Sequence, residues 1–170
     1  MIFESLPTTP RSEELLDKAF SRAARAGRSK SGLEAQQSML QTASSILADN
    51  LENVVTQWPD FGTVDPFYYE LADAIVDVDD LRQSLSKVTW ASRQIWHLRE
   101  EYQPKLRRTD PDKARKHRKQ AFARMADVVE EVAEDLERIG EARDALKTLP
   151  DIRPDEPAIV VAGYPNVGKS

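Results

Sequence analysis

Apolar side chains that recur every three or four residues dominate the sequence up to residue 149. This spacing places them on one face of an α-helix and predicts a mainly helical fold. The longest such set advances in steps of 3, 4, 3, 4, 3 and 7 residues and comprises Phe122, Met125, Val129, Val132, Leu136, Ile139 and Leu146. The heptad spacing predicts a single helix from about Pro111 to Thr148, with Arg143 in place of one apolar member. Such a helix would extend over roughly 50 Å, longer than a compact bundle of this size needs.

Four other helices are expected before residue 107. Thr9 is a suitable N-cap, followed by Pro10 in the first turn, for a helix that Gly27 would end. Pro104 is expected to kink or fray the end of the fourth helix. The short link at 107–110 then makes the fourth and fifth helices a long antiparallel α-hairpin. The second, third and fourth helices are expected at about 33–57, in a short segment after Asp65–Pro66, and at about 80–106.

Residues 1–149 are therefore expected to form an antiparallel helical bundle. Trp90 and Trp96 lie six residues apart on the fourth helix and cannot share one narrow seam. One is expected in the core and the other against a neighbouring helix or a partner, with base stacking as an alternative. Asp79 is well placed to cap the fourth helix. Expected core positions include Leu15, Ala19, Leu40, Leu47, Leu51, Leu81, Val88, Ile95, Leu98 and Tyr102.

Charge is distributed unevenly along the chain, whose net charge is −5. Two basic islands, residues 18–30 and 105–119, hold 13 of the 24 basic residues and 2 of the 29 acidic ones. The other 142 residues carry 11 bases and 27 acids, a net charge of −16. The cations expected to contact a polyanion such as RNA are Arg22, Arg25, Arg28, Lys30, Lys105, Arg107, Arg108, Lys113, Arg115, Lys116, Arg118 and Lys119.

Both islands fall around helix–helix turns, so each is expected at an end of the bundle. A charged tip can enter a groove of RNA while the acidic flanks stay outside it. The alternative is that these lysines and arginines only cover solvated helix faces. Two such islands on so acidic a chain favour the binding role.

The last part of the sequence has a different character. Residues 150–157 contain three prolines and are expected to form an extended linker. The run Ala158–Ala162 is typical of a buried strand, and G-x-x-x-x-G-K-S follows it directly. Residues 158–170 are thus expected to be the first strand and phosphate loop of a truncated α/β P-loop domain. The nucleotide-binding residues of this loop would be Gly163, Tyr164, Pro165, Asn166, Val167, Gly168, Lys169 and Ser170.

The order of four motifs resembles the nucleolar GTP-binding protein 1 family, in its archaeal form, among the Obg-type translation-associated GTPases. These motifs are Leu6-Pro7-Thr8, Asp65-Pro66-Phe67-Tyr68, Ile139 through Pro150, and the loop at 163–170. The resemblance implies a helical bundle that contacts large-subunit ribosomal RNA and ribosomal proteins of a pre-ribosomal particle, followed by a GTPase domain. It implies that Asn166, Gly168 and Lys169 hold the phosphates of GTP, that Ser170 binds Mg²⁺, and that Asn166 coordinates K⁺.

Other features exclude several classes of protein. The sequence has no cysteine, no secretory signal pattern and no apolar run of membrane-spanning length, so a cytoplasmic protein is expected, with neither membrane nor DNA as a partner. D-x-x-G and N-K-x-D are absent, so no catalytic residue is assigned and this chain is expected to lack GTPase activity. The alternative interpretation is a non-catalytic helical module that binds RNA or protein.

Overall fold

The computed structural model describes residues 2–149, and all of the secondary structure in this range is helical. The predicted helical fold is therefore confirmed, whereas the predicted linker, strand and phosphate loop at 150–170 lie outside the described residues. The helices are α1 (Ser12–Arg28), α2 (Gly32–Thr56), α3 (Pro66–Asp73), α4 (Val78–Arg107), α5 (Pro111–Glu131) and α6 (Ala133–Leu146).

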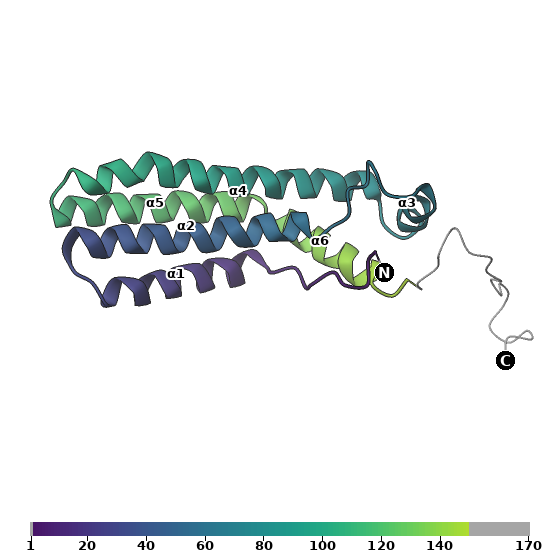
Figure 1. Cartoon of the computed structure of the whole chain (residues 1–170), viewed down its shortest axis with the longest axis horizontal. Coiled ribbons are helices and arrows are strands. Elements are labelled where there is room, and N and C mark those ends of the chain that lie inside the picture. The colour runs from purple at the N-terminus through teal and green to yellow at the C-terminus, as the bar shows by residue number, and fades with distance from the viewer. Residues whose placement is uncertain (1, 150–170) are drawn as a thin grey trace, which may run out of the picture.

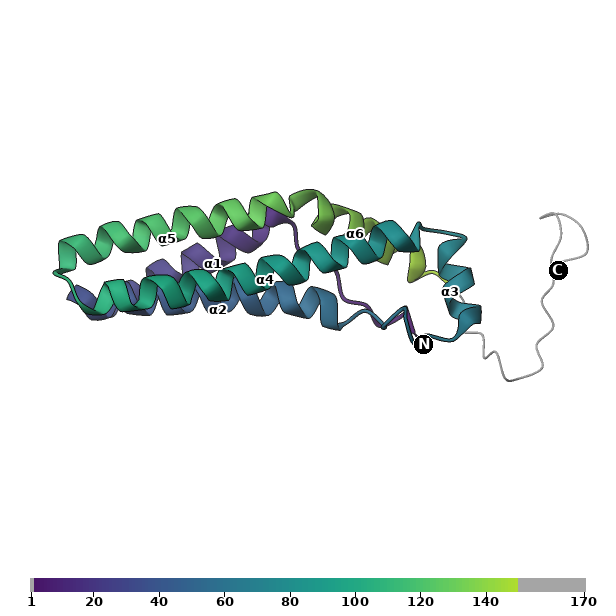
Figure 2. The same cartoon turned by 90° about the horizontal axis from the view of Figure 1, so that it is seen from above.

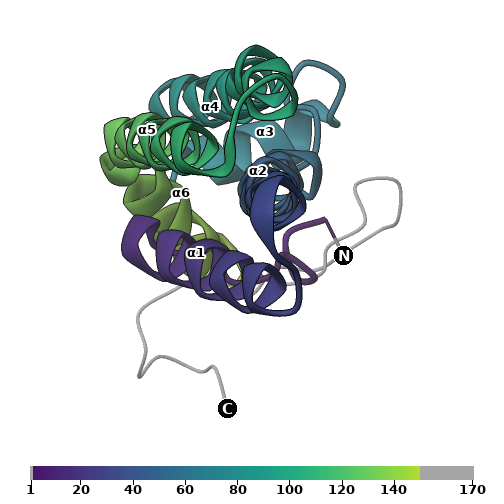
Figure 3. The ribbon, with the colours of Figure 1, turned by 90° about the vertical axis from the view of Figure 1, so that its left-hand side faces the viewer.

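Four long helices run alternately up and down and surround one core. Viewed from the end, α4, α5, α1 and α2 follow one another around it (Figure 3). The short α3 lies at one end of the bundle, and the α1–α2 and α4–α5 turns lie together at the other (Figures 1 and 2). Short connections make neighbouring helices antiparallel, as the sequence predicted for the α4–α5 hairpin.

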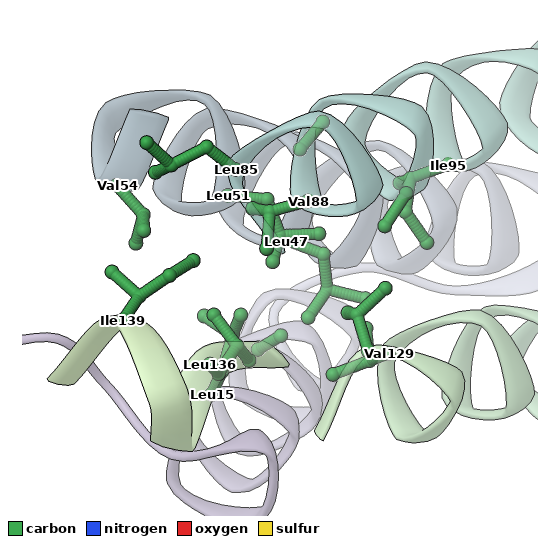
Figure 4. Close-up of a cluster of buried hydrophobic side chains, with 14 of the residues drawn as sticks. Leu15, Leu47, Leu51, Val54, Leu85, Val88, Ile95, Val129, Leu136 and Ile139 are labelled. Atoms are coloured by element: carbon green, nitrogen blue, oxygen red, sulfur yellow. The ribbon is translucent and has the colours of Figure 1, made fainter. Parts of the chain in front are cut away.

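The core is built from the apolar stripes of all the long helices. Leu47 and Leu51 of α2 lie against Val88 and Ile95 of α4, with Leu136 of α6 on the opposite side (Figure 4). Each of these side chains is at most 1% exposed, and burying one contributes roughly 1.5–3 kcal/mol. The expected core positions are confirmed as buried: Leu15, Ala19, Leu40, Leu47, Leu51, Leu81, Val88, Ile95, Leu98 and Tyr102.

The first helix begins later than predicted. Arg11, not Thr9, precedes it, with φ −82° and ψ 158°, so Pro10 belongs to an extended segment. This segment is held extended because Phe3 and Leu6 are buried, with the Phe3 ring centroid 6.5 Å from that of Trp58. At its other end the helix continues through Gly27, which was expected to terminate it, to Arg28.

The predicted single helix after Pro111 is wrong, because the chain bends at Val132. There φ is −102° and ψ is 14°, and the Val132 amide donates to the Val129 carbonyl oxygen at 3.2 Å. The bend directs α6 toward the N-terminal segment, where Arg143 Nε donates to the Leu6 carbonyl oxygen at 2.9 Å. This contact accounts for the arginine in the apolar seam. The heptad pattern identified the buried face correctly but could not reveal the change of direction.

The N-cap of the fourth helix differs from expectation, whereas the helix ends within one residue of the predicted end at about 106. Asp77, rather than Asp79, caps α4, and its Oδ1 accepts from the Asp80 amide at 3.1 Å. The helix starts earlier because Val78 is fully buried. At the other end α4 continues past the exposed Pro104 to Arg107. Between residues 2 and 149, no helix combines the length and apolar character needed to cross a membrane.

Candidate nucleic-acid interface

The two basic islands lie at the same end of the bundle. One surrounds the α1–α2 turn and the other surrounds the α4–α5 turn, and these turns are neighbours in the end view (Figure 3). Sequence reasoning predicted bundle ends for both islands but not that they share one end. We call the twelve cations predicted to bind RNA the basic tip: Arg22, Arg25, Arg28, Lys30, Lys105, Arg107, Arg108, Lys113, Arg115, Lys116, Arg118 and Lys119.

Local interactions hold both turns of the basic tip in short, defined conformations. In the first turn, Ser29 Oγ donates to the Ala26 carbonyl oxygen at 3.0 Å, and Gly32 has φ +63°. In the second, Asp110 Oδ1 accepts from the Lys113 amide at 2.9 Å. This hydrogen bond to the Lys113 amide, together with the nearby Lys113 charge, lowers the pKa of Asp110. The carboxylate thus stays ionised as a helix cap, and the cations around it project from a fixed scaffold.

Side-chain contacts between helices join the two islands. Arg118 Nε of α5 donates to Gln36 Oε1 of α2 at 2.9 Å. The Arg118 guanidinium also lies over the Phe122 ring, 5.0 Å from its centroid, and Phe122 stacks on Phe20 of α1 at 4.7 Å. Burial, and then the charge of Arg115, lowers the pKa of Arg118, which nevertheless remains a cation. Through these contacts, Arg118 of α5 is connected to α2 directly and to α1 through the stacked rings of Phe122 and Phe20.

The other eleven cations of the basic tip are exposed. None of the twelve forms an ion pair with a carboxylate anywhere in residues 2–149. The bundle does contain ion pairs elsewhere, such as Arg124 with Glu101 and Arg138 with Asp135. Because unpaired cations keep their full charge for a ligand, the tip can neutralise phosphates without first breaking ion pairs.

A shallow hollow of about 260 Å³ lies between the two islands. Lys30 from the first island and Arg107 from the second lie on its lining. Between them are three glutamine side chains, whose amides both donate and accept hydrogen bonds. Sequence reasoning missed these amides, and the only available signal was the close spacing of glutamines early in α2. The remaining lining residues are Glu34, Gln37, Ser38, Gln41 and Gln103.

The predicted nucleotide site has no counterpart in the described part of the chain. Residues Gly163 to Ser170, including the proposed Mg²⁺ ligand Ser170, lie outside residues 2–149. Within 2–149, no group of three or more histidine, aspartate or glutamate side chains could hold a metal ion. The candidate site that the structure describes is therefore the basic tip.

Comparison with known proteins gives consistent matches over the helical region. The family model for the NOG1 N-terminal helical domain matches residues 3–153. An uncharacterized protein of Methanocaldococcus jannaschii is 32% identical over 178 residues, covering 99% of this chain and 51% of the relative. Nucleolar GTP-binding protein 1 of Drosophila melanogaster is 29% identical over 72% of this chain and 19% of its own length. The protein of that name from Eremothecium gossypii is 24% identical, over 99% of this chain and 28% of its own length.

Proposed function

Since the chain belongs to the NOG1 N-terminal helical domain family, we propose that it is the docking region of a GTP-binding protein that acts in assembly of the large ribosomal subunit. In this proposal the basic tip binds ribosomal RNA of the pre-ribosomal particle. The observation that carries it is the meeting of both basic islands at one end of an otherwise acidic bundle.

The exposed cations of the basic tip suit the backbone of folded RNA. Double-stranded RNA is recognised mostly by its shape and by contacts to phosphates and 2′-hydroxyls, which an exposed cationic surface can make. The basic tip consists of two helix–helix turns and the helix ends around them. The acidic residues of α5 and α6 lie farther from this end of the bundle. The glutamine amides of the hollow can add hydrogen bonds to phosphate or sugar oxygens. Together these groups favour binding by shape and charge.

The nucleotide-dependent part of the proposal concerns residues 163–170. Relatives such as the Drosophila protein are named as GTP-binding, and the chain spans about half the length of the archaeal relative and a fifth of the Drosophila one. In a protein of such length, Asn166, Gly168 and Lys169 would hold the phosphates of GTP and Ser170 would bind Mg²⁺, with K⁺ near Asn166. Replacing K⁺ by Na⁺ should then slow GTP hydrolysis, and an unchanged rate would contradict the K⁺ site.

RNA binding by the basic tip can be tested with labelled fragments of large-subunit ribosomal RNA. The tip variant Arg115→Glu with Lys116→Glu should weaken binding at least about tenfold and lower the salt dependence of log K by about 2. A matched variant, Arg11→Glu with Lys147→Glu, makes the same change in charge at exposed positions beyond α1 and α6, far from the tip. Fluorescence anisotropy over a range of KCl concentrations measures both variants.

Comparing the two variants distinguishes an effect of local contact with RNA from an effect of the total charge of the protein. The proposal expects the distal variant to bind nearly as tightly as the unmodified chain. Equal weakening by both variants would mean that only the total charge matters and that the tip is a solvated helix end. Binding of a ribosomal protein, with no RNA binding by the unmodified chain, would favour the non-catalytic protein-binding module instead.

A further inference from the structure

We propose that the outer face of α4 is a second RNA-binding surface, which holds an unpaired nucleotide segment against the ring of Trp90. We call this surface the α4 stripe and define it as Arg82, Ser86, Lys87, Trp90, Arg93 and His97. This proposal depends on the proposed function only in naming RNA as the ligand, because the α4 stripe is separate from the basic tip.

Charge first distinguishes this part of α4 from the rest of the acidic body. Residues 81–99 contain Arg82, Lys87, Arg93 and Arg99 and no acidic residue. Acids flank the segment on both sides, at 79–80 and at 100–101. A third basic stretch therefore exists besides the two islands, and its cations are spread along one helix.

Helical geometry brings the stripe together on one face. Its members Arg82, Ser86, Trp90, Arg93 and His97 follow one another in steps of 4, 4, 3 and 4 residues, and all five are exposed. The Trp90 side chain is 37% exposed, whereas Trp58 in the core is 7% exposed. Part of the Trp90 indole therefore remains accessible to a ligand after folding.

The stripe is also hollowed. A depression of about 340 Å³ is lined by Ser86, Thr89, Trp90, Arg93, Gln94 and His97. A second of about 280 Å³, lined partly by Trp96, shares Thr89 and Arg93 with the first, so the two adjoin. Two aromatic side chains, a guanidinium, one carboxylate and several neutral polar groups thus border two adjoining depressions, the first on α4 and the second between α4 and α2.

The cations available to a ligand are Arg82 and Arg93. Neither forms an ion pair within residues 2–149, whereas Lys87 Nζ lies 4.0 Å from Glu131 Oε1 and 5.7 Å from the centre of the Trp90 ring. Two acids also border this surface: Glu52 lines the second depression together with Arg93, and Asp60 lines a neighbouring hollow together with Arg82. Phosphates are therefore expected at these two arginines rather than at Lys87, which lies beside Glu131.

This combination fits single-stranded RNA better than an acidic peptide or a duplex. Bases stack on an open indole ring, and such stacking is tolerant of sequence. Serine, threonine, glutamine and histidine side chains can bind base edges that only an unpaired strand exposes. An acidic peptide would use the two arginines but would leave the indole face and the neutral groups without a partner.

The α4 stripe is distinct from the basic tip along the same helix. Trp90 and Lys105 are separated by fifteen residues, which correspond to about 22 Å of helix. Glu100 and Glu101 lie between them. An RNA with a duplex at the tip and an unpaired strand beside it could contact both surfaces.

Tryptophan fluorescence provides a direct test. In a Trp96→Phe variant, the remaining tryptophans are the buried Trp58 and the exposed Trp90, so added oligouridylate should quench mainly Trp90. Trp90→Ala should weaken oligouridylate binding by about five- to 150-fold, the loss expected for one stacked base. Phe67→Ala is the matched control, because Phe67 is also 37% exposed but lies on α3. It should leave the affinity unchanged.

The failure of this proposal and of the basic tip can be told apart. The tip variant Arg115→Glu with Lys116→Glu should still show quenching of Trp90 by oligouridylate, even if its binding to ribosomal RNA is lost. Arg93→Glu should abolish that quenching while leaving the circular dichroism spectrum unchanged. Absence of quenching in the Trp96→Phe protein, or equal affinities for the Trp90→Ala and Phe67→Ala variants, would overturn the proposal. So would equal quenching by polyglutamate, which would indicate an acidic protein partner.

Discussion

The two ends of the helical bundle are closed in different ways. At the basic tip, two short turns carry exposed cations that have no ion-pair partner in residues 2–149. At the opposite end, the N-terminal segment and the chain around α3 enclose a cluster of aromatic rings. There Phe3, Trp58 and Phe61 lie with centroids 6.2–6.5 Å apart, and each is at most 7% exposed.

Buried aromatic packing and exposed positive charge are thus concentrated at opposite ends of the bundle. Aromatic burial contributes free energy of folding at the α3 end. The cations of the basic tip project into water and contribute little to packing. Substitutions in the aromatic cluster should therefore lower the free energy of unfolding, whereas substitutions of the basic-tip cations should lower RNA affinity with little change in stability.

The largest effect is expected for Trp58→Ala in the aromatic cluster. Removing the indole leaves a cavity beside Phe3 and Phe61 and should lower the free energy of unfolding by about 3–5 kcal/mol. Urea denaturation followed by circular dichroism measures the change. Trp90→Ala, at an exposed site, is the control and should cost less than about 1 kcal/mol. Similar losses for both variants would contradict the attribution of this effect to the burial of Trp58.

A smaller effect is expected for Gly32→Ala at the first turn of the basic tip. Gly32 has φ +63°, a conformation that should cost about 1–2 kcal/mol once a Cβ is present. Gly140→Ala is an informative contrast, because a Cβ there would meet Thr9 Cβ at an ordinary 3.6 Å. In the interior of α6, alanine should instead stabilise by roughly 0.5–1 kcal/mol. Changes of the same sign in the two melting curves would refute this reasoning.

Asp110→Ala at the second turn should be milder still and should depend on pH. The pKa of Asp110 is lowered, chiefly by the Lys113 amide hydrogen bond. Its contribution is therefore fully present above the pKa of an unfolded aspartate and is lost as pH falls through the lower pKa of the folded state. The urea midpoints of the Ala variant and the unmodified chain should differ at pH 7 and converge in acid.

Asp110→Asn provides the control for this pH dependence. Asparagine caps a helix about as well as aspartate but does not titrate. The Asn variant should thus stay close to the unmodified chain at pH 7 and should not share its loss in acid at this site. A constant difference between the Ala variant and the unmodified chain at all pH values would rule out a titrating cap.

The smallest effect on stability is expected for the tip variant Arg115→Glu with Lys116→Glu. Both side chains are exposed and unpaired, so the free energy of unfolding should change by no more than about 0.5 kcal/mol. The same protein should lose most of its affinity for ribosomal RNA. A denaturation curve and a binding isotherm from one preparation make the comparison. A stability loss as large as that of Trp58→Ala would show that the tip is part of the folding core.

Much of the fold could be predicted because its signals are local and long. The apolar periodicity of α2 and α4 continues over many turns, and it identified buried positions such as Leu51 and Val88 correctly. The start of α1 and the bend at Val132 could not be predicted, because both depend on contacts far apart in sequence. Leu6 and Arg143, which meet through a hydrogen bond, are separated by 137 residues.

The candidate site also has a part that the sequence predicts and a part that it does not. The sequence alone determined which residues form the two basic islands, that each island surrounds a helix–helix turn, and that a phosphate-loop motif follows the helical region. Only the tertiary structure decided that both turns share one end of the bundle. With α3 as the connection between α2 and α4 at the far end, α4 returns antiparallel to α2 and brings its own turn beside the first. The exposure of Trp90 also depends on the tertiary structure, because apolar periodicity cannot tell which side of a helix will lack a neighbouring helix.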